Sequence, residues 1–280
     1  MRIGVFIVPG GEDPAATVEQ IVTADRAGLD FAGVQDHPYQ RSFLDTWTLL
    51  SFAAARTDRI TLLPDVLNLP LRQPAVLAKA ATSLDVLSGG RVELGLGAGA
   101  FWEGVEAMGG PRRTPGESVS ALEEAVTLIH TFFRGETLRQ EGEFYSAAGA
   151  KPGPAPAHPI GLWIGAYGPR MLRLTGRLGD GWLPSVGGHY MSEPDALANQ
   201  GVIDEAAERA GRDPADIARA ANVGLDDPAE FLDPERLARI ATELRFEVVL
   251  VSVPSDDPLE FIRRLGEEVA PRARELAAGD

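Results

Sequence analysis

The sequence predicts a (β/α)8 barrel in which a single domain spans residues 1–280. Its length is close to the roughly 250 residues typical of this fold. Eight short apolar or β-branched runs recur along the chain, at residues 3–8, 31–35, 60–66, 92–96, 162–164, 181–183, 217–223 and 247–253. Since helical patterns separate most of these runs, they predict eight strand–helix units, enough to close a parallel barrel.

The expected helices carry apolar periodicity and helix-start signals. Apolar residues recur at helical spacing within residues 18–22 and 76–87. Four helices are expected to begin near a proline, at Pro14, Pro74, Pro234 and Pro258. The alternative, an open doubly wound sheet, usually carries a phosphate loop after its first strand. Residues 9–12 (PGGE) do not match that loop, which favours the barrel.

One connection is much longer than the others and covers residues 99–159. It contains a helical pattern around residues 118–133 and a Gly/Pro-rich stretch at residues 151–159. We interpret it as an insertion into the barrel that shapes a substrate pocket, rather than as a linker between domains.

The composition and net charge disfavour several classes of binding partner. The formal net charge is −15, with 41 acidic against 26 basic residues, which disfavours nucleic acid and anionic membranes. No export signal is visible and no apolar run spans a bilayer, so we expect a soluble cytoplasmic protein with a small-molecule substrate. With no cysteine, thiolate chemistry is excluded, and no metal-ligand spacing is present.

Polar residues that directly follow barrel strands lie at the catalytic face. Asp36 and His37 follow the second strand. A histidine there is a candidate general base or a hydrogen-bond donor to a ring cofactor, because its ordinary pKa lies near neutrality. The alternative is a helix-capping aspartate beside a surface histidine. Of the other histidines, His130 and His158 are expected to be structural, and His189 is a weak candidate for substrate contact.

Glycines follow the fourth and fifth strands. The run at residues 95–100 (GLGAGA) nominally fits a dinucleotide-binding fingerprint, but it follows the fourth strand and no acidic strand end lies about 20 residues later. We interpret Gly97 and Gly99 as permitting close approach of a ligand's planar rings, with tight strand packing as the alternative. After the fifth strand, a helix start with a neighbouring arginine predicts a phosphate site, carried by Gly165, Ala166, Tyr167, Gly168 and Arg170. A turn with a solvent-exposed arginine is the alternative.

The chain resembles the luciferase-like monooxygenase superfamily, flavin- or deazaflavin-dependent oxidoreductases built on an α/β barrel. Residues 31–37 (FAGVQDH), 74–99, 162–170 with 179–185, and the final DDPLEFI and EEVAPR segments carry the resemblance. It implies a cofactor ring in the barrel mouth and a phosphate near the helix after the fifth strand. The protein partners that it suggests are a flavin or F420 reductase and a second copy of the chain.

The resemblance also implies roles for single residues. Asp36 and His37 match a pair that contacts the ring and serves acid/base chemistry in the deazaflavin branch. Asp65 and Val66 match a bulge, often a nonproline cis peptide, that backs the ring. Ala100 stands where some sugar-phosphate dehydrogenases of that branch have a catalytic glutamate, and Glu103 would replace it only if its loop curls inward.

The leading hypothesis is hydride transfer between coenzyme F420 and a small organic substrate. One alternative is an FMN-dependent two-component monooxygenase that uses reduced flavin and O2. A noncatalytic flavin-binding protein is a further alternative.

Overall fold

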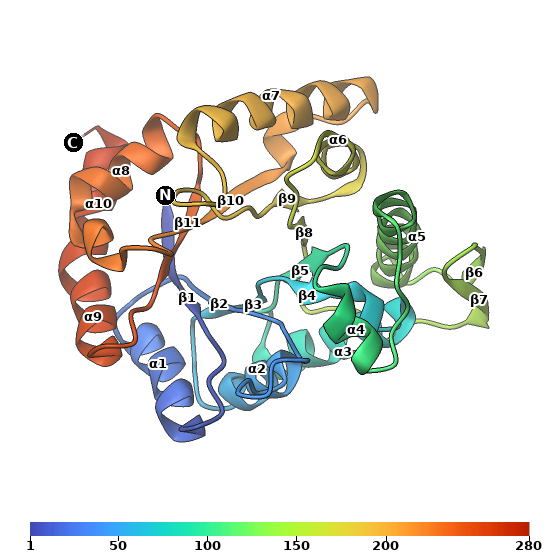
Figure 1. Ribbon diagram of the computed structural model, residues 1–280, viewed down its shortest axis with the longest axis horizontal. Helices are drawn as coiled ribbons and strands as arrows, with labels where there is room; N and C mark the ends of the chain where they lie inside the picture. The colour runs from blue at the N-terminus through green and yellow to red at the C-terminus, as the bar shows by residue number, and fades with distance from the viewer. Residues whose placement is uncertain (280) are drawn as a thin grey trace.

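The strands of the barrel form one parallel sheet that closes on itself (Figure 1). The computed structural model describes residues 1–279. The sheet order is β3-β2-β1-β11-β10-β9-β8-β5-β4, and a parallel bridge between Leu62 and Val92 joins β3 to the strand region before β5. Its strands are β1 (Arg2–Ile7), β2 (Phe31–Val34), β3 (Thr61–Pro64), β4 (Leu67–Asn68), β5 (Leu94–Gly97), β8 (Leu162–Ile164), β9 (Gly181–Trp182), β10 (Ala218–Val223) and β11 (Val248–Ser252).

The predicted barrel is therefore confirmed, and each of the eight predicted strands is present with its ends shifted by a few residues at most. One predicted strand, residues 60–66, differs in detail. The chain leaves regular pairing at Asp65 and Val66, so β3 pairs with β2 whereas β4 pairs with β5. Together β3 and β4 occupy one position in the ring, and the bulge between them opens onto the barrel mouth.

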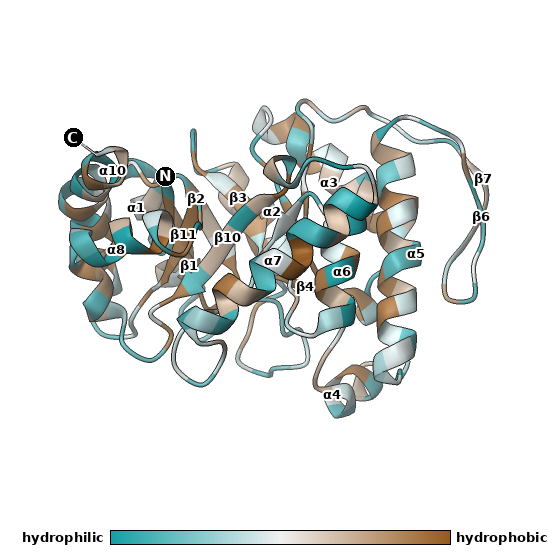
Figure 2. Cartoon of the chain, turned by 90° about the horizontal axis from the view of Figure 1, so that it is seen from above, coloured by the Kyte–Doolittle hydropathy of each residue, from teal (hydrophilic) through white to brown (hydrophobic). Residues whose placement is uncertain are grey.

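Helices surround the barrel, and hydrophobic residues are frequent in the central strands (Figure 2). A separate apolar cluster fills the barrel interior, where Phe6, Phe31, Trp163 and Leu250 meet. Prolines open four helices as predicted, because the first helical position needs no backbone N–H. The helices are α1 (Pro14–Arg26), α2 (Thr46–Ala54), α3 (Pro74–Ser88), α4 (Trp102–Ala107), α5 (Pro115–Phe133), α6 (Pro169–Leu178), α7 (Glu193–Arg209), α8 (Pro234–Thr242), α9 (Pro258–Arg264) and α10 (Ala270–Ala278).

The long connection contains α4, α5 and a hairpin that the sequence analysis did not predict, formed by β6 (Leu138–Glu141) and β7 (Ser146–Ala150). The hairpin lies at the outer edge of the molecule beside α5 in both views (Figures 1 and 2). Glu124 on α5 holds its turn by accepting hydrogen bonds from the backbone N–H groups of Phe144 and Tyr145. Only the start of the insertion reaches the mouth cavity described below, so the hairpin does not shape that pocket.

Within residues 1–279, no helix combines the length and the apolar character needed to cross a membrane.

Candidate active site

A cavity of about 610 Å³ lies at the carboxyl ends of the barrel strands. Most residues predicted from the sequence line it, namely Asp36, His37, Asp65, Val66, Gly97, Gly99, Gly165, Tyr167 and Gly168. Side chains that the sequence analysis did not assign to a site join them, including Tyr39, Asn68, Phe101, Met171, Tyr190 and Asn222. Within the described residues, no group of three or more acidic or histidine side chains is arranged to bind a metal ion.

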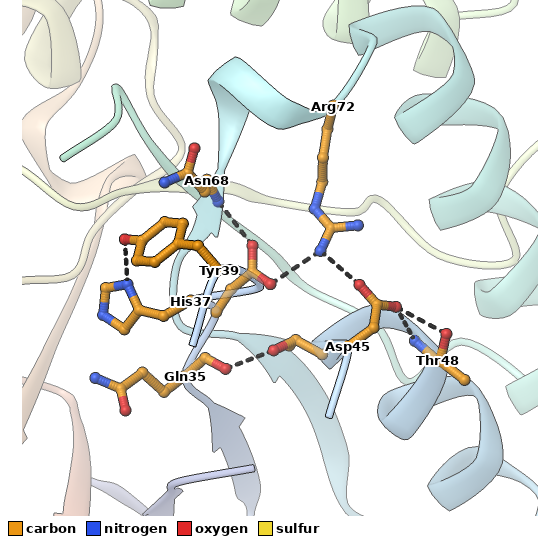
Figure 3. Close-up of polar contacts among 9 residues, drawn as sticks. Gln35, His37, Tyr39, Asp45, Thr48, Asn68 and Arg72 are labelled. Carbon is orange, nitrogen blue, oxygen red and sulfur yellow. Dashed lines mark hydrogen bonds and ion pairs between the residues drawn. The ribbon is translucent and has the colours of Figure 1, made fainter. Parts of the chain in front are cut away.

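His37 lines the cavity and is held by two aromatic neighbours. Its Nδ1 lies 2.6 Å from the hydroxyl oxygen of Tyr39 (Figure 3). Its ring packs nearly perpendicular to that of Phe101, at a centroid distance of 5.2 Å. Burial lowers the pKa of His37 below its ordinary value of 6.5, although the negative charge of Asp36 acts in the opposite direction. The imidazole is therefore neutral at pH 7. With Nδ1 engaged by Tyr39, Nε2 is the nitrogen available to exchange a proton with a ligand.

Asp36 is held by the protein on both carboxylate oxygens (Figure 3). Oδ2 accepts a hydrogen bond of 2.8 Å from the backbone N–H of Asn68, and Oδ1 accepts one of 2.9 Å from Arg72 Nη2. The same Arg72 nitrogen donates to Asp45, which caps α2 through the backbone N–H of Thr48. The Asp36 side chain is fully buried. This arrangement suits a residue that fixes the backbone beside His37 better than one that reacts.

Replacing Asp36 by Asn should therefore affect both stability and His37. Loss of the carboxylate leaves the largely buried Arg72 with Asp45 alone, and breaking a buried ion pair costs about 3 kcal/mol or more. Removal of the nearby negative charge should also lower the pKa of His37 further, which NMR titration would detect. Urea denaturation measures the stability change.

Asp45→Asn is the matched control, because Arg72 then keeps Asp36 and the altered side chain is 43% exposed. Asparagine still caps α2, so the loss should be at most about 1 kcal/mol, the usual worth of a partly exposed ion pair. Equal losses in the two variants, with an unchanged His37 pKa, would contradict the positioning role of Asp36.

Asp65 lies at the floor of the cavity without a charged partner. It is buried, and burial raises its pKa to about 7, although a 3.0 Å hydrogen bond from Asn222 Nδ2 to Oδ1 acts against this rise. The second oxygen, Oδ2, has no partner among the described residues, and the same holds for Oδ1 of Asn68 and Oδ1 of Asn222. Buried polar atoms in proteins are almost always hydrogen-bonded. Three such oxygens on one cavity indicate that a polar ligand group completes the site.

The glycines of the fourth and fifth strands make room for a shelf formed by Val66. A Cβ atom at Gly97 would lie 2.9 Å from Val66 Cγ2, and one at Gly165 would lie 3.0 Å from the same atom. At Gly99, which has a φ of 106°, a Cβ atom would meet Pro70 at 2.6 Å. Tight packing against Val66 and Pro70 thus explains why these positions are glycine. Val66 itself lines the cavity, where the rings of a ligand would rest on it. The Asp65–Val66 peptide bond is cis, as the resemblance implied.

The start of α6 adjoins the cavity and is open. Its N-cap residue is Gly168, which supplies no side-chain cap and leaves open space where a Cβ would stand. Uncapped N–H groups at a helix start attract phosphate. The shelf, the unpartnered oxygens and this helix start together fit a planar ring that carries a phosphate.

Two predicted residues lie elsewhere. Ala166 is buried, with its carbonyl accepting a hydrogen bond from Trp182, and it does not line the cavity. The side chain of Arg170 lies outside the barrel in a groove between helices. His189, the weak candidate for substrate contact, is exposed beside Asp226 and is also absent from the cavity lining.

No acidic side chain of the loop after the fourth strand replaces the glutamate that Ala100 lacks. Ala100 lines the cavity, whereas the carboxylate of Glu103 is bound 2.9 Å from Arg112 at the surface. Hydrogen bonding to Arg112 lowers the pKa of Glu103. The loop does not curl inward, so Glu103 does not take the place of a catalytic glutamate.

The sequence analysis missed two residues that hold predicted site residues. Asn222 donates a hydrogen bond to Asp65, and Arg72 binds Asp36 next to His37. Asn222 could have been suspected, since it interrupts the apolar end of a predicted strand. Arg72 gave no local signal, because its partner Asp36 is 36 residues away in sequence.

A parallel barrel with a polar, partly buried cavity at its strand ends defines an enzyme site. Residues 1–225 match the family model described as luciferase-like monooxygenase, and the chain belongs to this family of enzymes. The resemblance found in the sequence is thereby confirmed.

Related sequences agree with this assignment. The chain is 30% identical to an F420-dependent glucose-6-phosphate dehydrogenase of Intrasporangium calvum, over 91% of this chain and 86% of that protein. It is 33% identical to the enzyme of the same name from Mycolicibacterium fortuitum, over 89% and 75%.

Two solved structures share the fold at low sequence identity. An F420-dependent secondary alcohol dehydrogenase in complex with an F420-acetone adduct has a TM-score of 0.84 at 19% identity, covering 98% of this chain and 99% of that one. The oxygenating constituent of 3,6-diketocamphane monooxygenase from Pseudomonas putida, in complex with FMN, has a TM-score of 0.76 at 18% identity, covering 97% and 98%.

Proposed function

We propose that this protein transfers a hydride between coenzyme F420 and a small organic substrate. The observation that carries the proposal is the place of His37 in the same cavity as the Val66 shelf, with Nδ1 held by Tyr39 and no partner for Nε2 among the described residues. The relatives named F420-dependent dehydrogenases support the choice of cofactor. When bound, the deazaflavin ring would supply the hydride acceptor or donor.

The protein's own residues would hold the ring and manage the proton. Val66 would back the ring, and the uncapped start of α6 at Gly168 would hold its phosphate. In the tautomer whose Nδ1–H donates to the Tyr39 oxygen, His37 Nε2 would take the hydroxyl proton during alcohol oxidation, while the carbon-bound hydrogen leaves as hydride to the deazaflavin; the reverse reaction would return both. Tyr39 and Phe101 would keep the imidazole in place.

A sugar phosphate is not the substrate that we favour, despite the names of the relatives. Ala100 stands at the position of the catalytic glutamate, and Glu103 is bound to Arg112 away from the cavity. A smaller alcohol or carbonyl compound needs only the single proton carrier that His37 provides.

Cofactor titration tests the assignment most directly. Purified protein should bind oxidised or reduced F420 more tightly than FMN, measured by fluorescence at equal ionic strength. The expected preference arises from His37 at the ring site, with Asp36 fixing the backbone beside it. If FMN binds tenfold more tightly, a difference of about 1.4 kcal/mol, the F420 assignment is wrong.

An FMN-dependent monooxygenase remains the second candidate, supported by the family's description and by the FMN-bound neighbour. That reaction would require a partner reductase and O2. Oxygen consumption driven by reduced FMN, absent with F420, would favour it. Turnover with either cofactor would rule out a purely noncatalytic binding role.

A further inference from the structure

A second cavity, which we term the arginine groove, lies outside the barrel between α5, α6 and α7. These three helices lie beside one another in Figure 1. The groove has a volume of about 490 Å³, and its only acidic lining residue among those described is Glu123. Four arginines line it, namely Arg170, Arg173, Arg177 and Arg209. In a protein of net charge −15, this concentration of positive charge on one groove needs an explanation.

Two of the four arginines are paired with a carboxylate, and the other two are not. Arg177 is bound to Glu123 through two hydrogen bonds of 3.1 Å, and Arg209 is paired with Glu205 at 3.0 Å. Arg170 and Arg173 have no hydrogen bond or ion pair within residues 1–279, and both are exposed. Two guanidinium groups are therefore free to bind an external anion.

The spacing on α6 arranges these charges in a row. Arg170, Arg173 and Arg177 are separated by three and four residues, so they lie on one face of the helix. At 1.5 Å per residue the row extends over about 10 Å. Such a row fits a chain that carries several negative charges better than it fits a single phosphate.

The row begins where the active-site cavity ends. Arg170 belongs to the first turn of α6, and its neighbours Gly168 and Met171 line the mouth cavity. The Nη1 atom of Arg170 lies 3.4 Å from the position that a Cβ would occupy on Gly116 at the start of α5. A ligand whose phosphate lies at the α6 start could thus continue directly into the groove.

We propose that the arginine groove binds the polyanionic tail of the cofactor. This inference rests on the proposed function, since F420 carries a phosphodiester followed by γ-linked glutamates, whereas FMN ends at its phosphate. Arg170 and Arg173 bind tail carboxylates, whereas Arg177 stays paired with Glu123. The groove accordingly contributes affinity for F420 that neither FMN nor a tail-free deazaflavin receives.

The test compares binding of F420 bearing several glutamates with binding of the deazaflavin that lacks both phosphate and glutamates. Fluorescence titration gives Kd for each, without any turnover. Arg173→Gln should weaken the tailed cofactor about three- to tenfold and leave the tail-free ring unchanged within error. The double variant Arg170→Gln with Arg173→Gln should lose more and show a weaker dependence of Kd on salt.

Arg263→Gln is the matched control, because it removes an exposed arginine on α9, far from the groove, and should change neither Kd. Equal effects of Arg173→Gln on both ligands, or equal affinity of the wild-type protein for both at all salt concentrations, would overturn the groove inference alone. Failure of both deazaflavins to bind would overturn the proposed function together with it.

Discussion

His37→Ala is expected to lower kcat by about 10²- to 10⁴-fold, the usual contribution of a positioned proton carrier. Cofactor Kd should change much less, because in the proposed binding mode Val66, backbone groups and the α6 start would hold the ring and phosphate. Single-turnover hydride transfer, followed by the absorbance of F420, separates the two effects.

The pH profile gives this prediction a second readout. Since burial lowers the pKa of His37, alcohol oxidation by the wild-type protein should persist at pH 6.5 and decline only at lower pH, as the imidazole becomes protonated. That acid limb should be absent from the His37→Ala profile.

Tyr39→Phe serves as the companion variant, because it removes the hydroxyl group beside Nδ1 but keeps the aromatic packing around His37. Its loss of kcat should be smaller than that of His37→Ala. Full turnover of His37→Ala with a proven substrate would show that His37 only positions the ligand and that the proton moves by another route.

Asp65→Asn is expected to stabilise the protein, and increasingly so as the pH rises. The folded-state pKa of Asp65, about 7, lies above its ordinary value of 3.8. The folded protein therefore holds a proton that the unfolded chain releases, and stability falls as pH rises between these two values. A difference of about three pH units is equivalent to up to about 4 kcal/mol, present in full above pH 7. Asparagine keeps the shape and carries no charge.

Urea denaturation at pH 5 and pH 8 measures the effect. The gain from Asp65→Asn should be larger at pH 8 by roughly 2 to 3 kcal/mol, since only part of the cost is present at pH 5. Asp256→Asn, which alters an exposed aspartate, should change stability by less than about 0.5 kcal/mol at both values. A pH-independent difference for Asp65→Asn would show that this carboxyl group titrates normally.

The protonation state of Asp65 should also change the affinity for a ligand. A protonated Oδ2 can donate to a ligand acceptor, whereas the unpartnered Oδ1 of Asn222 can accept from a ligand donor. The pair would thus match an adjacent carbonyl and N–H group on a ring. The wild-type Kd for such a ring should increase above pH 7, and the Asp65→Asn variant should lack that dependence.

Local sequence signals were sufficient for the barrel and for much of the mouth. Apolar runs alternating with helical periods predicted all eight strands, because strand and helix repeats differ in their side-chain spacing. Strand ends then placed Asp36, His37 and Gly165 at one face, since the carboxyl ends of parallel strands gather at the same end of a barrel.

The directions of side chains, and the distant residues that they contact, could be seen only in the tertiary structure. Asp36 was expected at the ring, but its oxygens are bound by Arg72 and Asn68, which reach it through the fold. Arg170 was placed near the phosphate by its position in the sequence, yet its side chain lies in the arginine groove. Gly97 and Gly165 were predicted as ligand contacts; they line the cavity, and the structure adds that they also accommodate Val66.

The barrel, the family and the strand ends that line the mouth could therefore be predicted from the sequence, because they depend on patterns within short segments. The burial of Asp65 against Asn222, 157 residues away, became visible only in the folded chain. The same holds for the groove that four arginines of α6 and α7 share. Burial and charge at these sites depend on which segments pack together, and packing between distant segments leaves no periodic trace in a single sequence.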